Sequence, residues 1–305
     1  MKRAVVTGGA GFVGSHIADA LSERGVEVTV FDRVESPWLR RGQRFVHGEI
    51  TDAAAVARAV DGADVVYHLA ALADLNEGKT KPLDTARVNL LGTLNVLEAL
   101  RASGAKTRLM FASTIYVFSR EGGFYRCSKQ ACESYIEEYA RVFALPYTVL
   151  RYGSLYGPRS GPSNGVFRLL QQAATKGRVA YPGSPDDVRE YIHVEDAARL
   201  SVDAAAPEFA GKHLVLTGSQ ATRASDLFTM FGELLGKPVE VDYGHEQQGH
   251  YKVTPYTYTP KPGRKLTAAQ FVDMGQGLLQ VVEQLHHQLD GQLDGPGQHG
   301  DKGRR

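Results

Sequence analysis

The segment from Arg3 to Gly14, RAVVTGGAGFVG, constrains the fold more than any other part of the chain. A short apolar run breaks into glycines and then resumes with apolar residues at helical spacing, which predicts a strand, a tight turn and a helix. Gly8 permits a sharp turn, Gly11 leaves room for a pyrophosphate, and Gly14 lets the helix lie close to the strand. The N-terminus of such a helix favours a phosphate group.

A carboxylate follows these glycines at the distance that a dinucleotide site requires. Val26 to Phe31 forms a second apolar run, and Asp32 closes it about twenty residues beyond the glycines. A carboxylate there holds a ribose diol and repels a 2′-phosphate, which favours NAD over NADP, although the neighbouring Arg33 weakens that discrimination. The structural alternative is a loop of glycines with a helix-capping aspartate.

Composition excludes several classes of partner. The chain has 305 residues, 43% of them hydrophobic, and a net charge of +1 without a basic stripe, so nucleic acid and anionic membranes are not expected partners. No stretch reaches membrane-spanning length and no leader precedes the first strand, which predicts a cytoplasmic protein. Cys127 and Cys132 are expected to be structural packing residues, and the adjacent His286 and His287 point to different faces, so no metal site is predicted.

Strands and helices alternate through the first half of the chain. Strands are predicted at 44–50, 64–69, 108–112 and 147–152, with helices at 53–60 and 84–103, which indicates an α/β fold with a doubly wound parallel sheet. Ligands of such sheets bind at the carboxyl ends of the strands. Glu49 and Ile50 end one strand beside the expected adenine, while Thr51 and Asp52 have an equally good interpretation as a helix N-cap. His68 is typical of a packed strand residue.

The chemistry is therefore expected just beyond the strand that ends at Ala112. Tyr125 and Lys129 stand four residues apart in a segment with helical periodicity, which places the phenol and the ammonium on one helix face. There the cation lowers the cost of forming a phenolate, so that Tyr125 acts as a general acid or base. A surface pair of no function is the alternative.

Taken together, these segments resemble the extended short-chain dehydrogenase/reductase family, and specifically its nucleotide-sugar epimerases and dehydratases, over residues 1–245. The motifs that carry the resemblance are Thr7-Gly8-Gly9-Ala10-Gly11-Phe12-Val13-Gly14, Asp32, His68-Leu69-Ala70-Ala71, Asn89, Thr114, Tyr125 and Lys129. The resemblance implies that Thr114 hydrogen-bonds the reacting sugar hydroxyl, that Tyr125 moves its proton, and that Lys129 holds the nicotinamide ribose. The implied cofactor is NAD, and the implied assembly is a homodimer built from helices 84–103 and 128–143.

The cofactor site expected on these grounds comprises Gly8, Gly11, Phe12, Val13, Gly14, Asp32, Arg33, Glu49, Ile50, Leu69, Ala70, Ala71, Asn89, Tyr125, Lys129 and Tyr152.

Segments beyond the catalytic helix resemble the parts of the family that bind a nucleotide-diphosphate sugar. Asn164-Gly165 and the following helix correspond to the part that clasps the nucleotide, and Arg189 stands where the family meets the pyrophosphate. Gly153 and Ser154 replace the family's Phe-Asn pair, so the identity of the sugar stays open. The expected substrate site comprises Thr114, Ser154, Asn164, Gly165, Val166 and Arg189.

The expected organisation is a Rossmann-type NAD-binding domain with a smaller C-terminal substrate-binding lobe. The domain takes residues 1–152 and about 189–216, the lobe about 153–188 and 217–289, and residues 290–305 form a disordered tail. The lobe includes expected helices at 224–235 and 275–289, and residues 244–268 depart from the family pattern without indicating any chemistry.

The leading functional prediction is a 4-epimerase, which oxidises one sugar hydroxyl to a ketone and returns the hydrogen to the opposite face. A 4-ketoreductase and a regulatory NAD-binding protein without turnover are the alternatives. Elimination of water or carbon dioxide is not expected, because Ile115 and Tyr116 occupy the positions where the family's dehydratases and decarboxylases carry carboxylic acids. Glu121 is the one nearby substitute, in a predicted turn.

Overall fold

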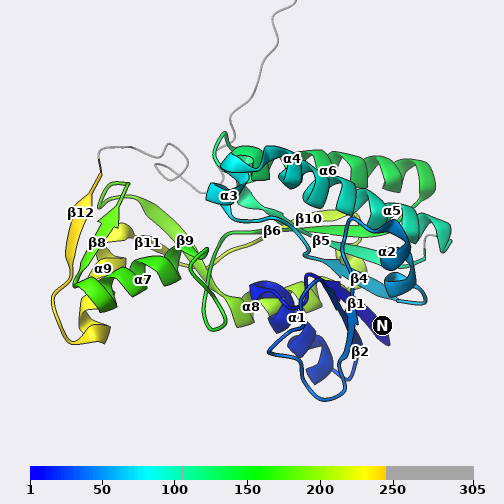
Figure 1. The fold of residues 1–305 in the computed structure, drawn as a ribbon, viewed down its shortest axis with the longest axis horizontal. Coiled ribbons are helices and arrows are strands. Elements are labelled where there is room, and N and C mark those ends of the chain that lie inside the picture. Colours follow the sequence, from blue (N-terminus) through cyan, green and yellow to red (C-terminus); the bar gives the residue numbers. More distant parts are fainter. Residues whose placement is uncertain (105, 245–305) are drawn as a thin grey trace, which may run out of the picture. The chain divides into compact units, whose positions relative to one another are not determined.

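Seven parallel strands form the central sheet of this computed structural model, which describes residues 1–104 and 106–244 (Figure 1). The strands lie in the order β10 (Lys212–Leu216), β6 (Tyr147–Tyr152), β5 (Arg108–Thr114), β4 (Val65–His68), β1 (Arg3–Thr7), β2 (Glu27–Asp32) and β3 (Arg44–His47). The order reverses between β1 and β4, as in doubly wound dinucleotide-binding folds. The predicted fold class is therefore confirmed.

Helices cover both faces of this sheet, which explains why its inner strands consist largely of buried apolar residues. Helices α1 (Phe12–Glu23) and α8 (Val194–Asp203) lie on one face, and α2 (Ala53–Val60), α5 (Gly92–Ala102) and α6 (Gly123–Phe143) lie on the other (Figure 1). Successive β1 side chains alternate between the two cores: Val6 packs in the core with Ile17 of α1, and Val5 in the core with Val56 of α2.

The helix predicted at 84–103 is interrupted in the structure. It divides into α4 (Pro82–Thr85), a π-helical turn η1 (Ala86–Leu91) and α5, and a further short helix, α3 (Leu75–Thr80), precedes them. In the widened turn, the carbonyl oxygen of Asn89 accepts hydrogen bonds from the side chains of Thr93 and Cys132. Such turns occur often at functional sites, and simple helical periodicity does not reveal them.

Several element ends differ from the prediction by a few residues. The strand expected at 44–50 ends at His47, and Asp52 caps α2 by accepting hydrogen bonds from the amides of Ala54 and Ala55. The N-cap interpretation is thus confirmed for Asp52. Cys132 is buried as expected, but Cys127 is exposed on the solvent side of α6, so the packing prediction was wrong for that residue.

The remaining elements form two small sheets and their helices. A three-stranded sheet contains β7 (Ser154–Tyr156), β9 (Val188–His193) and β11 (Ala221–Arg223), and a two-stranded sheet pairs β8 (Arg178–Tyr181) with β12 (Glu240–Tyr243). Helices α7 (Gly165–Lys176) and α9 (Ala224–Leu235) share a core with β8. The short turns η2 (Ile115–Phe118) and η3 (Pro207–Phe209) complete the described elements.

The division into an NAD-binding domain and a substrate lobe, with its boundaries, stays a proposal. β10 lies in the large sheet, whereas β9 pairs with β7 and β11 in the three-stranded sheet. The expected helix at 275–289 and the expected tail at 290–305 lie outside the described residues. Among the described helices, none is long and apolar enough to cross a membrane.

The contact between α1 and the turn before it generates a stability prediction. A Cβ on Gly14 would lie 2.2 Å from the carbonyl oxygen of Gly8, so Gly14→Ala is expected to lower the free energy of unfolding by about 1–3 kcal/mol. At Gly11 the nearest atom is the same oxygen at 3.2 Å, and the backbone is extended. Gly11→Ala is therefore the control, with little loss in thermal or denaturant unfolding; equal losses in the two variants would contradict this account.

Candidate active site

The glycine turn after β1 packs directly on the segment that follows β4. The amide of Gly8 donates to the carbonyl of Phe31 at 2.9 Å, and the amide of Gly11 donates to that of Gly8 at 3.1 Å. Gly8 has a φ of +71°, and a Cβ there would lie 2.6 Å from the amide nitrogen of Ala70. The turn therefore needs glycine both for its conformation and for this close approach.

The N-terminus of α1 is open to a ligand. Gly11 is its N-cap, and no side chain caps the helix, so the first amides, including those of Phe12 and Val13, lack an intrahelical acceptor. A Cβ on Gly11 would meet nothing but the oxygen of Gly8 within 4 Å. This combination of free amides and open space suits a pyrophosphate.

Asp32 lies at the end of β2, beside the same turn. One carboxylate oxygen accepts from the amide of Ala10 at 3.0 Å, and the other accepts from that of Val34 at 3.3 Å. Each oxygen keeps acceptor capacity for a ribose hydroxyl. Arg33 is exposed next to it.

The expected adenine contacts at the end of β3 differ in burial. Glu49 is exposed, whereas Ile50 is buried against Gly92 at the start of α5. The carbonyl of Ile50 accepts a hydrogen bond from the side chain of Asn95 at 3.0 Å. The side chain of Ile50 is thus part of the core beneath this strand end.

Buried polar residues hold the Leu69–Ala71 segment against the turn. The amide of Leu69 donates to the carbonyl of Thr7 at 3.0 Å. Both amide hydrogens of Asn89 are used within the protein, toward the carbonyl of Leu72 and the hydroxyl of Ser128, and its oxygen accepts from the amide of Leu72 at 2.7 Å. Asn89 therefore ties this segment to α6, and its predicted contact with the cofactor remains a prediction.

His68, the last residue of β4, is a packed structural residue, as the sequence indicated. Its ring nitrogens pair with the hydroxyls of Thr7 at 2.7 Å and Thr93 at 3.0 Å. Burial, helped by the charge of Lys129, lowers the pKa of His68 to about 3. The ring is therefore neutral and held within β4.

The three predicted catalytic residues come from the end of β5 and the start of α6. Thr114 is buried, and its hydroxyl accepts from the amide of Tyr116 at 3.3 Å. Tyr125 lies in the first turn of α6, with no hydrogen bond from its hydroxyl to the described residues. Lys129 follows one turn later and is buried, and its ammonium donates to the carbonyl of Ala112 at 2.7 Å.

The electrostatics of this pair differ from the sequence prediction. Burial raises the pKa of Tyr125 above its ordinary value, whereas the sequence predicted an easier ionisation of the phenol. The Lys129 nitrogen lies 4.6 Å from the Phe111 ring centre and 5.8 Å from that of Tyr125, and burial lowers its pKa to about 8. An ammonium has three donors, of which Ala112 takes one. Lys129 thus keeps two donors for a ligand.

A buried ion pair that the sequence did not single out joins the strands to the catalytic helix. Glu133, one turn beyond Lys129, accepts hydrogen bonds from Ser113 of β5 and, at 2.6 and 3.1 Å, from Arg151 of β6. Arg151 also donates to His213 of β10 at 2.9 Å. Burial alone would raise the pKa of Glu133, but its polar neighbours His213, Arg151 and Ser113 outweigh it and lower that pKa to about 2.

Three of the residues predicted to touch ligands make contacts within the protein. The hydroxyl of Tyr152 pairs with that of Ser201 on α8 at 2.7 Å, which places it in the core. Asn164 caps α7 through the amide of Phe167 and donates to the carbonyl of Leu155 at 2.8 Å. The guanidinium of Arg189 lies 5.9 Å from the Tyr181 ring centre. Their predicted ligand contacts remain predictions.

The remaining residues expected to bind substrate lie on β7 and at the start of α7. Ser154 is half-buried on β7, Gly165 is exposed at the start of α7, and Val166 packs against the core of that helix. A Cβ on Gly153 would lie 2.6 Å from the hydroxyl oxygen of Thr217, so a side chain at this position would displace Thr217. Between Thr114 and Tyr125, Glu121 is exposed.

Comparison with known proteins identifies the family. Residues 4–216 match the NAD dependent epimerase/dehydratase family. The chain belongs to this family. The resemblance seen in the sequence is thereby confirmed, and NAD is the cofactor that the open α1 terminus, the glycine turn and Asp32 fit.

Individual relatives include enzymes with different chemistry. A UDP-N-acetyl-alpha-D-glucosaminuronate decarboxylase of Bacillus cytotoxicus is 29% identical, covering 90% of this chain and 92% of the relative. A putative UDP-glucose 4-epimerase of Methanocaldococcus jannaschii is 26% identical, covering 91% and 96%. The relatives of this chain thus include both a decarboxylase and a putative epimerase.

Solved structures of epimerases share the fold. A UDP-glucose 4-epimerase of Thermotoga maritima with UDP-glucose gives a TM-score of 0.75 at 28% identity, covering 94% of this chain and 99% of that one. A UDP-glucose 4-epimerase of Thermus thermophilus with NAD gives 0.70 at 32% identity, covering 81% and 88%.

The Glu133 ion pair generates a prediction about acid stability. Because the folded protein lowers the pKa of Glu133 from 4.5 to about 2, its contribution, on the order of 3 kcal/mol, is complete above pH 4.5 and is lost as the pH falls toward 2. Glu133→Gln is expected to lower the free energy of unfolding at pH 7 by roughly 3 kcal/mol, because Arg151 loses its buried partner. The free energy of unfolding of this variant is also expected to depend less on pH below pH 4.5.

The matched control for this variant lies on the same helix. Glu138 pairs with Arg141 at 2.6 Å, but its side chain is 60% exposed, so Glu138→Gln is expected to leave the free energy of unfolding nearly unchanged. Urea unfolding between pH 2 and 7 measures both variants. Parallel pH curves for Glu133→Gln and the unmodified protein would show that this carboxylate does not carry the acid dependence.

Proposed function

We propose that this protein epimerises a nucleotide-diphosphate sugar at C4, with NAD as its cofactor, through a transient 4-keto sugar. The arrangement of Thr114, Tyr125 and Lys129 at the end of β5 and the start of α6, beside the glycine turn, carries the proposal. This set suffices for reversible oxidation and reduction at one carbon.

In this scheme each residue has a separate task. Tyr125 accepts the proton of the sugar hydroxyl, and Thr114 hydrogen-bonds that hydroxyl and holds it in place. Bound NAD supplies the two-electron acceptor for the sugar carbon. The two donors that Lys129 retains hold the nicotinamide ribose, and its charge stabilises the phenolate once the ligands are bound. The 4-keto sugar then turns over in the pocket, and Tyr125 returns the proton as the carbon is reduced on its other face.

The lack of a carboxylate beside Thr114 supports epimerisation over elimination. Ile115 is buried, Tyr116 has no carboxyl group, and Glu121 is exposed. The family resemblance implies that removal of water or carbon dioxide uses carboxylic acids at these positions in addition to the redox residues. We therefore propose that this chain does not share the reaction of its decarboxylase relative.

The direct test is incubation of the protein and NAD with UDP-glucose, UDP-N-acetylglucosamine and UDP-glucuronate, with products identified by mass and NMR. A C4 epimer of one of these, without net NADH, supports the proposal. Accumulation of NADH together with a 4-keto sugar would indicate a ketoreductase running in reverse, and a 4-keto-6-deoxy sugar or carbon dioxide would indicate elimination. Either result overturns the assignment.

Tyr125→Phe tests the proposed proton transfer. The variant loses the hydroxyl while the ring remains, so kcat is expected to fall by about 10²–10⁴, with NAD affinity little changed. Tyr135→Phe is the matched control, because Tyr135 is exposed on the same helix. Turnover by Tyr125→Phe at the level of this control would exclude Tyr125 as the acid and base.

Arg189 is proposed to bind the substrate pyrophosphate, because a guanidinium makes bidentate, charge-assisted hydrogen bonds to phosphate oxygens. Arg189→Ala is expected to raise KM at least ten-fold with a smaller change in kcat. The control is Arg178→Ala, since Arg178 lies on β8 in an exposed ion pair with Asp242. A loss of kcat at unchanged KM would refute the assignment.

A homodimer remains part of the proposal. Apolar side chains are exposed on the helices expected to pair: Leu91 at the end of η1, and Tyr135, Val142 and Phe143 on α6. Sedimentation equilibrium is expected to give twice the chain mass of 33.2 kDa. A mass of one chain at micromolar concentration would contradict the homodimer.

A further inference from the structure

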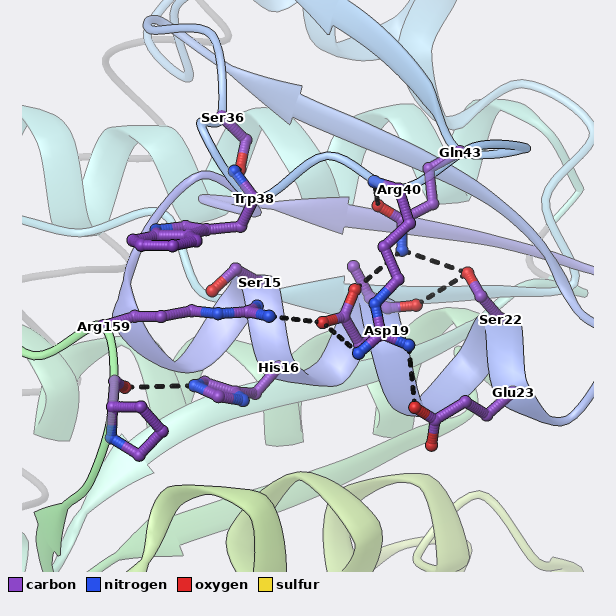
Figure 2. A network of polar contacts seen from close by, with 12 residues as sticks. Ser15, His16, Asp19, Ser22, Glu23, Ser36, Trp38, Arg40, Gln43 and Arg159 are labelled. Atoms are coloured by element: carbon purple, nitrogen blue, oxygen red, sulfur yellow. Dashed lines mark hydrogen bonds and ion pairs between the residues drawn. The ribbon is translucent and has the colours of Figure 1, made fainter.

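The loop after β7 is attached to the cofactor helix at two points. The ring of His16 on α1 pairs through Nε2 with the carbonyl of Pro158 at 3.1 Å, and one turn later Asp19 accepts from Nη2 of Arg159 at 2.7 Å. Figure 2 shows the Arg159 side chain extended between the rings of Trp38 and His16 toward Asp19. The same helix presents its N-terminus to the predicted cofactor.

This attachment is largely shielded from water. The Asp19 side chain is 5% exposed and that of Arg159 is 16% exposed. The guanidinium lies 5.1 Å from the Trp38 ring centre, and its buried Nη1 has no hydrogen bond to the described residues. Asp19 is therefore the main partner of this charge, and a low-dielectric setting makes such an interaction strong.

The backbone of the attached loop is held in an unusual conformation. Arg159 has a φ of +65°, in the left-handed region that non-glycine residues rarely adopt. Gly157 has a φ of +137°, and a Cβ there would lie 2.8 Å from Val194. Such conformations persist when their surroundings hold them, so the contacts with α1 stabilise the shape of this loop.

The carboxylate of Asp19 also binds two residues of the loop that follows β2. Arg40 contacts the same oxygen of Asp19 at 2.9 Å and also pairs with Glu23 at 2.8 Å, and Gln43 donates to the other oxygen of Asp19 at 3.1 Å (Figure 2). The carboxylate thus joins α1, the loop beyond Asp32 and the loop beyond β7. Arg40 is the more exposed of the two arginines, and it precedes β3, whereas Arg159 belongs to the chain that follows β7.

We infer that Asp19 and Arg159 are positioning residues that couple the cofactor helix to the substrate-side segment 154–164. This inference rests on the proposed function, because that segment carries Ser154 and Asn164. Asn164 donates to the carbonyl of Leu155, and Ser160 donates to that of Gly157 at 2.7 Å, so the segment is held together internally. NAD bound at the N-terminus of α1 therefore stabilises the observed conformation of segment 154–164 through Asp19 and Arg159. By linkage, a ligand bound to this segment raises the affinity for NAD by the same factor.

The test measures the affinity of UDP by calorimetry with and without saturating NAD. In the unmodified protein, NAD is expected to tighten UDP binding roughly five-fold or more. In Arg159→Met this ratio is expected to approach one, because the aliphatic stem still packs on Trp38 while the ion pair is lost. Asp19 keeps Arg40 in this variant, so its charge stays compensated and the protein is expected to fold.

Arg40→Met is the control, since it removes the other ion pair of the same Asp19 oxygen, together with an exposed pair to Glu23, without touching segment 154–164. It is expected to keep the ratio of the unmodified protein. A ratio unchanged in Arg159→Met, or equally reduced in Arg40→Met, would overturn the inference.

Amide hydrogen exchange separates this inference from the proposed function. NAD is expected to slow exchange in 154–164 in the unmodified protein and in Arg40→Met, and to leave it unaltered in Arg159→Met, with exchange in β5 reporting that each variant is folded. If UDP does not bind but NAD still slows exchange through Arg159, the coupling stands and the substrate class is wrong. If NAD slows exchange equally in Arg159→Met, the coupling is wrong.

Discussion

The close approach of helix α1 to the turn after β1 determines where the rest of the site lies. Gly14 allows the helix to pack on the carbonyl of Gly8, and Gly8 in turn packs on the backbone of Ala70. These contacts bring the ends of β1, β2 and β4 together beneath the open helix terminus. A side chain at either glycine would separate the phosphate-binding amides from the strand ends that carry the remaining ligand contacts.

The catalytic end of the site depends on a second set of buried contacts. Lys129 is fixed on β5 through Ala112, and Glu133 fixes the same helix to β5 and β6 through Ser113 and Arg151. The Tyr125 hydroxyl makes no such bond to the described residues. The group proposed to move a proton is thus presented by a rigid helix, which is the arrangement that precise proton transfer requires.

Sequence patterns predicted those parts of the structure that follow from local periodicity and from glycine spacing. The strand at 147–152 and the helix at 224–235 were predicted to the residue, and the glycine turn, the Asp32 position and the Tyr125–Lys129 spacing lie where the motifs indicated. These features are local, because a strand run, a tight turn or a four-residue spacing is written in consecutive residues.

Features that depend on distant partners were not visible in the sequence. The π-turn at 86–91 arises where Asn89 meets Leu72 and Cys132, and the Glu133 pair needs strands far away in the chain. The raised pKa of Tyr125 likewise reflects burial that no spacing encodes. The bonds of Asn164 to its own helix and of Tyr152 to Ser201 show that a family motif identifies a position without fixing what its side chain touches.

In the proposed reaction, the hydride that leaves C4 of the sugar returns to the same carbon. The most direct test uses the nucleotide sugar that turns over, deuterated at C4, with NAD and without added NADH. The expected product is an epimer that retains deuterium at C4. Loss of the deuterium to solvent, or its accumulation in free NADH, would contradict it.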